Sequence, residues 1–486
     1  VVAMGTEMNR DLIAGMGLST DDIAAATAND LIIAVDATDG EAADAAAAKV
    51  DELLQKKSRG DGGSTYRPGS FAGALQAATD ANLAIVSLPG QFAAREARKA
   101  LNAGLHVMLF SDNVSVDEEV SLKKLAVRKG LLMMGPDCGT AIINGAPICF
   151  ANVVPRGPIG IVAASGTGLQ EVSCAIAKAG SGVSQAIGTG GRDIKEEAVG
   201  GMMMLQGISA LAADPATDVI VVVSKPPKAS LTPRVMDALK AAGKPAVVHF
   251  VGTKADDDDE NIRYAANLTD AARLAVALAG GDATAAAGAA SAEEIEQIVT
   301  RESAKIAAGQ KYLRGLFVGG TLTDEAVAVL CEPLGGVHSF DAADASLALK
   351  DPHRSQQHTI VDLGEDVFTV GRPHPMIDPS IRTERIDREA DDPEVALLLV
   401  DCVLGYGSHH DPAGAMVESI VRARAKAVER GGYLPVIASI TGTDDDPQGL
   451  AGQRAKLEAA GCVVMPTNYQ AAKLAARIME GVQNGR

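Results

Sequence analysis

The chain has 486 residues, of which 47% are hydrophobic and 22% charged, the balance of a folded protein with a core rather than of a disordered one. Its formal net charge of −18 repels phosphate backbones and anionic membranes, and an aromatic content of 3% without Trp gives few platforms for stacking bases. No apolar run reaches the ~18 residues of a membrane helix. We therefore expect a cytoplasmic protein that binds neither nucleic acid nor membrane.

Short Val/Ile/Leu-rich runs alternate with Ala-rich amphipathic stretches along the chain, which predicts buried parallel strands with helices on both faces. The fold class is thus α/β, with doubly wound sheets. The expected strands are Leu31–Val35, Leu83–Leu88, His106–Phe110, Leu131–Met134, Ile159–Ala163, Val219–Val223, Ala246–Val251, Leu316–Val318, Ala396–Val400, Leu434–Ser439 and Val463–Met465, and the clearest helices are Ala93–Ala103 and Ser115–Lys129.

Two composition changes suggest domain boundaries. A Pro-Arg-Gly-Pro turn lies within 154–158, directly before an expected strand. The Ala/Gly-rich stretch 280–293 lacks the apolar run that is typical of a strand. We expect domains at 1–153, 154–285 and 310–486, with a linker helix at 286–309. The acidic runs 256–259 and 444–446 predict solvated loops, with an acidic docking surface as the alternative.

The six cysteines are widely spaced, and no Cys-x-x-Cys pair occurs. Several of them lie in apolar stretches, which indicates reduced core thiols in a reducing compartment. The adjacent residues His409 and His410 follow an expected strand, but no carboxylates accompany them at metal-ligand spacing. We predict no metal site.

The strand that ends at Ala163 runs into a turn of small residues. Ser165, Gly166, Thr167 and Gly168 leave the first N–H groups of the following helix open to a ligand, and the helix dipole favours an anion there. A Thr-x-x-Gln spacing from Thr167 has the pattern of a capping box. The alternative interpretation is an ordinary capped helix start.

A second copy of this arrangement follows the strand at 316–318. Gly319, Gly320 and Thr321 again place a Gly-Thr pair after a strand, and in both copies a Glu stands four residues after the Thr. If the two domains face each other, both dipoles converge on one anion, as an acyl phosphate or a phosphoryl group in transit requires. Neither copy is a P-loop, because the Gly-Lys-Ser/Thr ending is absent.

A third motif is the turn 134–140, where Asp137, Cys138 and Gly139 follow a Gly-Pro pair at a strand end. Such a turn can present backbone N–H groups to a substrate, or it can simply close a domain edge. A nucleophilic role for Cys138 is disfavoured because no His lies near it in the sequence.

Two cations are further candidate substrate contacts. Arg192 belongs to a Gly-rich loop at 188–193 and can pair with a carboxylate or phosphate through two bonds, although a surface salt bridge is the plainer alternative. Lys225 stands at the end of a strand, where open α/β sheets place their ligands.

The densest polar segment runs from 362 to 379. Prolines hold Arg372, His374 and Asp378 in a stiff loop, and we take these three as candidate catalytic residues. Arg372 would bind a substrate carboxylate and His374 would transfer a proton near neutral pH. A rigid brace between domains is the alternative.

The chain resembles the alpha subunit of succinyl-CoA synthetase continued by the carboxy-terminal domain of its beta subunit and, over nearly its whole length, the FdrA family. The supporting strings are Phe-Ser-Asp-Asn-Val at 110–114, Met-Gly-Pro-Asp-Cys-Gly-Thr at 134–140, Ser-Lys-Pro-Pro at 224–227 and Val-Gly-Arg-Pro-His-Pro-Met-Ile-Asp-Pro at 370–379. The resemblance implies a Rossmann-like CoA-binding-type domain followed by two flavodoxin-like domains, and it adds Asn113 to the candidate substrate contacts.

Three departures from the synthetase bear on function. No Gly-Phe-Thr-Gly-type CoA loop follows the first strand, where 4–9 read Met-Gly-Thr-Glu-Met-Asn. The loop that carries the phosphorylated histidine in the synthetase corresponds to 253–267, which contains no His. No segment is left for an ATP-grasp domain. These departures argue against a self-contained ligase that works through phosphohistidine.

The resemblance to the FdrA family implies a subunit of an oxamate carbamoyltransferase in allantoin breakdown, which converts oxalurate and phosphate into oxamate and carbamoyl phosphate. An acyl-CoA ligase working with a separate nucleotide-binding partner is the first alternative, and a non-catalytic assembly subunit is the second. We expect phosphate or carbamoyl phosphate as substrate, CoA only as a possible ligand, and other subunits or copies of the chain as partners.

Overall fold

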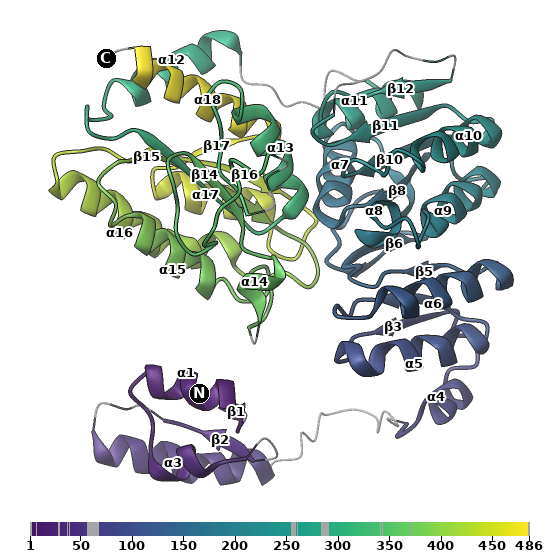
Figure 1. Cartoon of the computed structure of the whole chain (residues 1–486), viewed down its shortest axis with the longest axis horizontal. Coiled ribbons are helices and arrows are strands. Elements are labelled where there is room, and N and C mark those ends of the chain that lie inside the picture. The colour runs from purple at the N-terminus through teal and green to yellow at the C-terminus, as the bar shows by residue number, and fades with distance from the viewer. Residues whose placement is uncertain are drawn as a thin grey trace. The chain divides into compact units, whose positions relative to one another are not determined.

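The computed structural model describes residues 2–5, 7–27, 30–35, 37, 39–55, 68–253, 259, 261–282, 291–340, 342, 344–370 and 372–484. The chain divides into two units, one of residues 1–79 with 370–372 and one of residues 80–369 with 373–486 (Figure 1). Each unit is described by itself.

The first unit contains β1 (Val2–Met4), α1 (Glu7–Gly15), α2 (Asp21–Ala25), β2 (Leu31–Ile33), α3 (Gly40–Gln55) and α4 (Phe71–Ala77). β2 pairs antiparallel with β1, and Leu31 at its start is exposed. The expectation of a buried parallel strand at Leu31–Val35 is therefore wrong. The apolar run there reflects a small core around Ile13 and Ile32 rather than a doubly wound sheet.

The second unit begins with a small parallel sheet. Its strands stand in the order β3 (Leu83–Val86), β4 (His106–Leu109) and β5 (Met133–Met134), with α5 (Gly90–Asn102) and α6 (Val116–Lys129) between them in the chain. Ser115 caps α6 through a complete capping box with Glu118, and Gly130 ends that helix in the left-handed conformation. The strands and helices expected here are confirmed, and each strand is slightly shorter than its apolar run.

A hairpin of β6 (Thr140–Ile143) and β7 (Ala146–Cys149) then joins the next sheet rather than this one. The described strands of 1–153 thus belong to three sheets, although the sequence pattern predicts one domain there. Strand pairing is non-local, so alternation of apolar runs cannot distinguish these sheets. The boundary near 154 itself stays a prediction.

The middle part of the second unit has a sheet in the order β12-β11-β10-β8-β9-β6-β7. Its five parallel strands are β8 (Ile159–Ala164), β9 (Val183–Gly188), β10 (Val219–Ser224), β11 (Ala246–Phe250) and β12 (Ile262–Tyr264). The helices are α7 (Gly166–Lys178), α8 (Arg192–Lys195), α9 (Met202–Ala213), α10 (Thr232–Ala242) and α11 (Leu268–Leu278). The parallel strands follow the flavodoxin-like order, which reverses between β8 and β10.

The C-terminal part repeats this topology with a fully parallel sheet, in the order β14-β13-β15-β16-β17. The strands are β13 (Tyr312–Phe317), β14 (Thr359–Asp362), β15 (Val395–Val403), β16 (Val436–Thr441) and β17 (Val463–Met465). The helices are α12 (Ala292–Ser303), α13 (Gly320–Leu330), α14 (Asp366–Thr369), α15 (Ser380–Glu389), α16 (Pro412–Glu429), α17 (Leu450–Ala459) and α18 (Asn468–Asn484). α12 lies within the stretch 286–309 where a linker helix is expected and ends earlier than predicted, and its role as a linker stays a prediction.

One hydrophobic core runs through both flavodoxin-like parts. Leu169 and Val221 of the middle part belong to the same buried cluster as Phe317 and Leu322 of the C-terminal part. α7 and α13 lie side by side where the two parts meet (Figure 1). The α/β class with several parallel sheets is thus confirmed, and the two parts face each other as the convergence of the two helix starts requires.

Three other expectations can be compared with the described residues. All six cysteines are free thiols, and Cys138, Cys174, Cys402 and Cys462 are buried. Asp446 of the acidic run 444–446 is buried and accepts a hydrogen bond from Val153 N at 2.8 Å, so this run is only partly a solvated loop. Most of the run 256–259 lies outside the described residues. None of the described helices is both long and apolar enough to cross a membrane.

Candidate functional site

α7 begins at the reversal of strand order in the middle part. Ser165 is its N-cap and accepts a hydrogen bond from Gly168 N at 3.0 Å. The helix therefore starts two residues before the predicted capping box at Thr167, and Gln170 instead donates to Asn152 Oδ1 at 3.0 Å. Ser165 rather than Thr167 is the N-cap because its backbone is extended and its short hydroxyl reaches the N–H of Gly168.

α13 begins at the matching position of the C-terminal part. Its N-cap is Gly319, which offers no side-chain oxygen to the first turn. The hydroxyls of Ser165 and Thr321 lie 2.5 Å apart, so the two helix starts touch. Partial positive charge at both N-termini is thus concentrated in one place, which is the arrangement that favours an anion.

Small residues make this approach possible. A Cβ at Gly168 would lie 3.0 Å from Cγ2 of Thr321, and a Cβ at Gly319 would lie 2.8 Å from Cγ2 of Thr167. The glycines at these two positions therefore serve helix packing. Gly166 and Gly320 meet fewer atoms, since a Cβ there would contact only Thr140 Oγ1 at 3.2 Å and the carboxyl of Asp362 at 2.8 Å, respectively. That hydroxyl and that carboxyl therefore lie against the first residues of the two helices.

Asp362 ends β14 and connects the start of α13 to the polar loop. Its Oδ1 accepts from Gly364 N at 2.8 Å. Burial, followed by repulsion from Glu365, raises the pKa of Asp362 to about 8, against the opposing effect of Lys225. The carboxyl is mostly protonated at neutral pH and can donate a hydrogen bond to an anion.

His374 lies next to this carboxyl. A Cβ at Gly364 would come within 2.5 Å of His374 Nε2 and within 3.1 Å of Asp362 Oδ1. His374 Nδ1 accepts from Met376 N at 3.1 Å, which assigns the ring proton to Nε2. Burial and Arg382 lower the pKa of His374 to about 4, so the ring is neutral at pH 7. It can donate through Nε2, but it does not titrate near neutrality as the sequence-based hypothesis expects.

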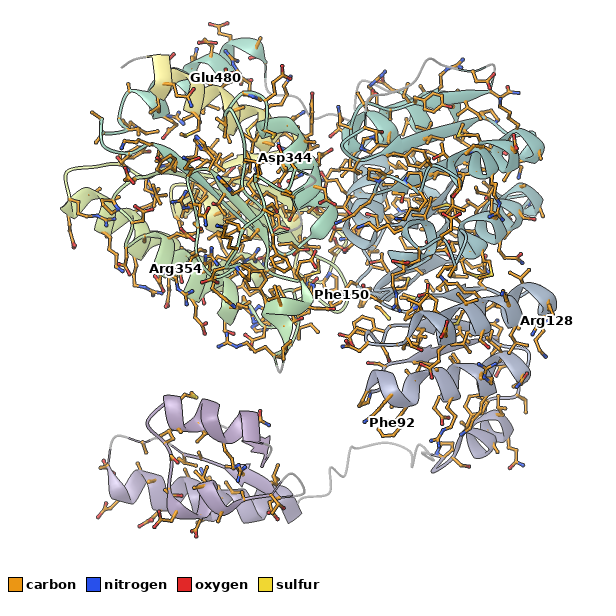
Figure 2. The ribbon with its side chains drawn as sticks, viewed as in Figure 1. Phe92, Arg128, Phe150, Asp344, Arg354 and Glu480 are labelled. Carbon is orange, nitrogen blue, oxygen red and sulfur yellow. The ribbon has the colours of Figure 1, made fainter. Side chains whose placement is uncertain are left out.

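Phe150 connects this loop to the middle part. Its ring centroid lies 5.7 Å from that of His374 and 5.5 Å from that of Phe110. Figure 2 shows Phe150 at the side of the middle part that faces the C-terminal part. The apolar ring shields one face of the imidazole, which is consistent with the lowered pKa of His374.

The turn 134–140 and the loop 188–193 pack on each other. A Cβ at Gly188 would lie 2.6 Å from Cys138 Sγ, and one at Gly190 would lie 2.4 Å from Pro136 O. The Gly-rich loop therefore approaches protein backbone at these positions rather than a ligand. Cys138 is buried, and desolvation raises its thiol pKa to about 12, so it is not a thiolate at neutral pH.

Asp137 and Arg192 stand on either side of this contact. Loss of hydration, then repulsion from Asp366 and Asp112, raises the pKa of Asp137 to about 7, while Arg192 lowers it. Arg192 pairs with Glu119 at 3.0 Å and donates to Val114 O at 2.8 Å. Arg192 therefore forms a salt bridge, which was the alternative to a substrate contact. Its charge also lowers the pKa of Asp137.

Lys225 directly follows the last residue of β10 and contacts α13 of the C-terminal part. Its ammonium lies 2.7 Å from the Asp324 carboxylate in the first turn and a half of α13. Burial alone would lower the pKa of Lys225, but Asp324, with Glu365 and Asp362, raises it. Lys225 is therefore the fixed positive charge beside the helix starts.

The remaining candidates are placed less favourably. Asn113 has a positive φ of 52° and lies on the loop whose carbonyl oxygens approach Gly90. Asp378 accepts from Ser380 N at 3.0 Å, a local contact at the start of α15. Arg372 belongs to the first unit. Its role, like those of Asn113 and Gly139, stays a prediction.

Sequence reasoning missed three residues of this site as candidates: Asp362, Thr140 and Phe150. Asp362 ends a strand next to the strand that leads into α13, and a strand end in an open parallel sheet was an available signal. Thr140 and Phe150 belong to the hairpin that crosses to the middle sheet. No local pattern in the sequence identifies that crossing.

Two family models and a full-length relative match this chain. Residues 316–478 match the family model described as CoA-ligase, which begins within β13 and covers α13. Residues 1–68 match a model described as AllF, heavy metal-associated domain. The uncharacterized protein YahF of Escherichia coli (strain K12) is 44% identical over 481 residues, which cover 98% of this chain and 91% of that protein. The chain belongs to the YahF family.

Two partial relatives have assigned activities. The ADP-forming sulfoacetate-CoA ligase subunit SauD of Bilophila wadsworthia (strain 3_1_6) is 25% identical over 40% of this chain and 67% of that protein. The succinate–CoA ligase [ADP-forming] subunit alpha of Aquifex aeolicus (strain VF5) is 29% identical over 30% of this chain and 48% of that protein. The resemblance to succinyl-CoA synthetase alpha is confirmed, while no comparison names the FdrA family.

The two ligands that these families imply can be tested against the residues. Residues 1–68 contain neither Cys nor His, so they supply no thiolate or imidazole ligand to a heavy metal, and methionines are their soft side chains. At the start of α5, a Cβ on Gly90 would lie 2.5 Å from the carbonyl oxygens of Asp112 and Asn113. The glycine at that helix start therefore packs against the backbone of the loop at 112–113.

Proposed function

We propose that the chain is the subunit of an acyl-transferring enzyme that holds an acyl phosphate at the paired starts of α7 and α13. The observation that carries this proposal is the 2.5 Å contact between the hydroxyls of Ser165 and Thr321, which brings the two helix N-termini together. Backbone N–H groups fixed before the ligand arrives stabilise charge that develops on a phosphate oxygen. Lys225 and the protonated carboxyl of Asp362 flank the site.

We further propose that the acyl group is carbamoyl, exchanged between oxalurate and phosphate in allantoin breakdown. A phosphate oxygen attacks the carbamoyl carbon, the bond from that carbon to the amide nitrogen breaks, and the phosphate proton ends on the nitrogen of oxamate. Support comes from the AllF-type model at 1–68 and from the absence of His in 253–267, which removes the phosphohistidine relay. The neutral His374 would donate a hydrogen bond from Nε2–H to the departing nitrogen and keep its proton, while the transferred proton comes from the phosphate.

An acid–thiol ligase that acts with a nucleotide-binding partner is the second candidate, and the comparisons favour it more directly. The CoA-ligase model covers 316–478, and the partial relatives with assigned activity are CoA ligase subunits. Acyl phosphates are also intermediates of such ligases, so the paired helix starts fit both functions. The lack of a Gly-Phe-Thr-Gly-type loop at 4–9 and of a His in 253–267 weighs against this candidate.

A ligand panel on the purified full chain separates the two functions. Melting temperatures are measured with phosphate, carbamoyl phosphate, acetyl phosphate, oxalurate, oxamate, CoA, succinyl-CoA and ADP, because a ligand specific for the folded state raises the transition by mass action. The carbamoyltransferase predicts a rise with carbamoyl phosphate and oxalurate, a smaller rise with acetyl phosphate, and none with CoA. A rise with CoA or succinyl-CoA and none with oxalurate would assign the chain to the ligases.

A further inference from the structure

The two glutamates that recur six residues into α7 and α13 each reach across to the other flavodoxin-like part. Glu171 of α7 accepts from Asn468 N, the first residue of α18, at 3.2 Å, and from Thr441 Oγ1 of β16 at 2.5 Å. Glu325 of α13 accepts from Leu268 N, the first residue of α11, at 2.9 Å. Each part thus supplies the carboxyl group that accepts from the first backbone N–H of the last helix of the other.

Asn468 joins the two halves of this exchange. While its backbone N–H binds Glu171, its side-chain amide donates to Glu325 Oε2 at 2.9 Å and to Leu322 O at 3.0 Å. All of these side chains are nearly inaccessible, with Glu171 4%, Glu325 3% and Asn468 1% exposed. The set Glu171, Glu325, Asn468 and Thr441 is called the interdomain clamp below.

We propose that the interdomain clamp consists of positioning residues that set the separation of the two helix starts at the acyl-phosphate site. The glutamates lie about 9 Å along each helix from its N-terminus, at a rise of about 1.5 Å per residue, so they do not touch the anion themselves. They fix how far each helix slides past the other, and with it the contact between Ser165 and Thr321. This inference rests on the function proposed above.

The direction in which anion affinity changes distinguishes a positioning role of the clamp from direct electrostatic repulsion. Removing a carboxylate near an anion site strengthens anion binding by reducing repulsion. Loss of the clamp instead lets the helices separate, which weakens anion binding. Glu325→Ala is therefore expected to weaken the binding of inorganic phosphate at least tenfold, and Asn468→Ala by a similar factor. Glu325→Gln keeps an acceptor for Leu268 N and is expected to bind within threefold of the wild type.

The experiment measures phosphate affinity by calorimetry and melting temperature for the full chain. Thr441→Val removes one donor to Glu171 at nearly constant volume, so it tests the clamp even if Glu325→Ala does not fold, and it is expected to weaken phosphate binding about threefold. The matched control is Glu302→Ala, since Glu302 is equally buried but accepts from Tyr433 at 2.6 Å. This control should melt lower with unchanged phosphate affinity.

Two results are decisive in different ways. Wild-type or tighter phosphate binding by Glu325→Ala, or by Thr441→Val where Glu325→Ala does not fold, overturns the clamp while leaving the proposed site intact. Absence of phosphate binding in the wild type overturns the proposed function itself, and the clamp with it.

Discussion

The ammonium of Lys225, at the end of β10, lies 2.7 Å from the carboxylate of Asp324 in α13. This ion pair connects the two flavodoxin-like parts beside the touching helix starts. Lys225 also acts on the carboxyls of Asp362 and Glu365, so its charge faces the proposed anion from the middle part while α13 faces it from the other side.

Lys225→Met is expected to weaken phosphate binding about tenfold, because a fixed charge beside the anion is replaced by an apolar group, equivalent to about 1.4 kcal/mol. Calorimetric titration with inorganic phosphate measures this. Lys240→Met is the control, since Lys240 forms an exposed pair with Asp259 and should bind phosphate normally. Equal affinity of both variants and the wild type would exclude Lys225 from the site.

The hydroxyl pair at the helix starts predicts a measurable coupling. Ser165→Ala loses an N-cap and Thr321→Val loses its bonded hydroxyl, each destabilising by about 1–2 kcal/mol. The double variant should cost about 1 kcal/mol less than the sum, because one hydrogen bond is shared. Urea unfolding followed by circular dichroism measures the three values.

The control for this coupling replaces Ser165→Ala by Ser173→Ala. Ser173 is buried on α7 and donates to Gln170 O at 3.0 Å within its own helix. Its effect should add to that of Thr321→Val within about 0.5 kcal/mol. Equal coupling in both pairs would mean that the contact between the helix starts contributes nothing specific.

Three carboxyls with raised pKa values predict that stability falls as pH rises. Burial raises the pKa of Glu325 to about 7, of Asp362 to about 8 and of Asp401 to about 6, against 3.8–4.5 for the same groups in an unfolded chain. Between about pH 4 and pH 8 these three carboxyls bind more protons in the folded protein than in the unfolded chain, so their deprotonation favours unfolding. The contribution of these carboxyls to the free energy of unfolding is fully present below about pH 4. It is lost as the pH rises through their pKa values in the folded protein.

Glu325→Gln removes one of these titrations. Its stability relative to the wild type should rise from pH 5 to pH 8 by about 1–3 kcal/mol, as urea unfolding at both values would measure. Glu294→Gln is the control, because the pKa of that exposed carboxyl is lowered by its capping bonds and it is ionised throughout this range. Parallel pH profiles for the wild type and Glu325→Gln would contradict the assignment.

Asp362 predicts that anion binding weakens in alkali. Sulfate is the suitable probe, because unlike phosphate it does not titrate near neutral pH. As pH rises through about 8, Asp362 loses the proton that it donates and becomes a negative charge, so sulfate affinity should fall at least tenfold between pH 6.5 and pH 9. In Asp362→Asn the amide keeps a donor, and the affinity should be nearly constant. A flat wild-type profile would reject this role.

The cysteines predict an order of reaction with a thiol reagent at pH 8. Cys149 and Cys331 are partly exposed, whereas Cys138, Cys174, Cys402 and Cys462 are buried. Burial raises the thiol pKa of Cys138 and Cys402 to about 12, which leaves almost no thiolate. Mass spectrometry should find Cys331 labelled first and the buried four only after denaturation. Early labelling of Cys138 would revive its role as a nucleophile.

The sequence by itself determined the repeated strand–helix units and the two small-residue helix starts. Both features are local: an apolar run of the length of Ala246–Phe250 marks a buried parallel strand, and the residues around Gly166 or Gly320 are sufficient to mark an open helix N-terminus. The position of Lys225 directly after a strand was also predictable, because the end of a parallel strand can be recognised without knowing its neighbours.

Only the tertiary structure decided which of these features meet. Ser165 and Thr321 are 156 residues apart, and Asp362 is placed beside Gly320 by the pairing of β14 with β13. The neutral state of His374 depends on burial against Phe150 and on Arg382, and the antiparallel pairing of β2 depends on β1. Packing and strand pairing act between distant residues, and desolvation depends on everything that surrounds a group, so neither leaves a local pattern in the sequence.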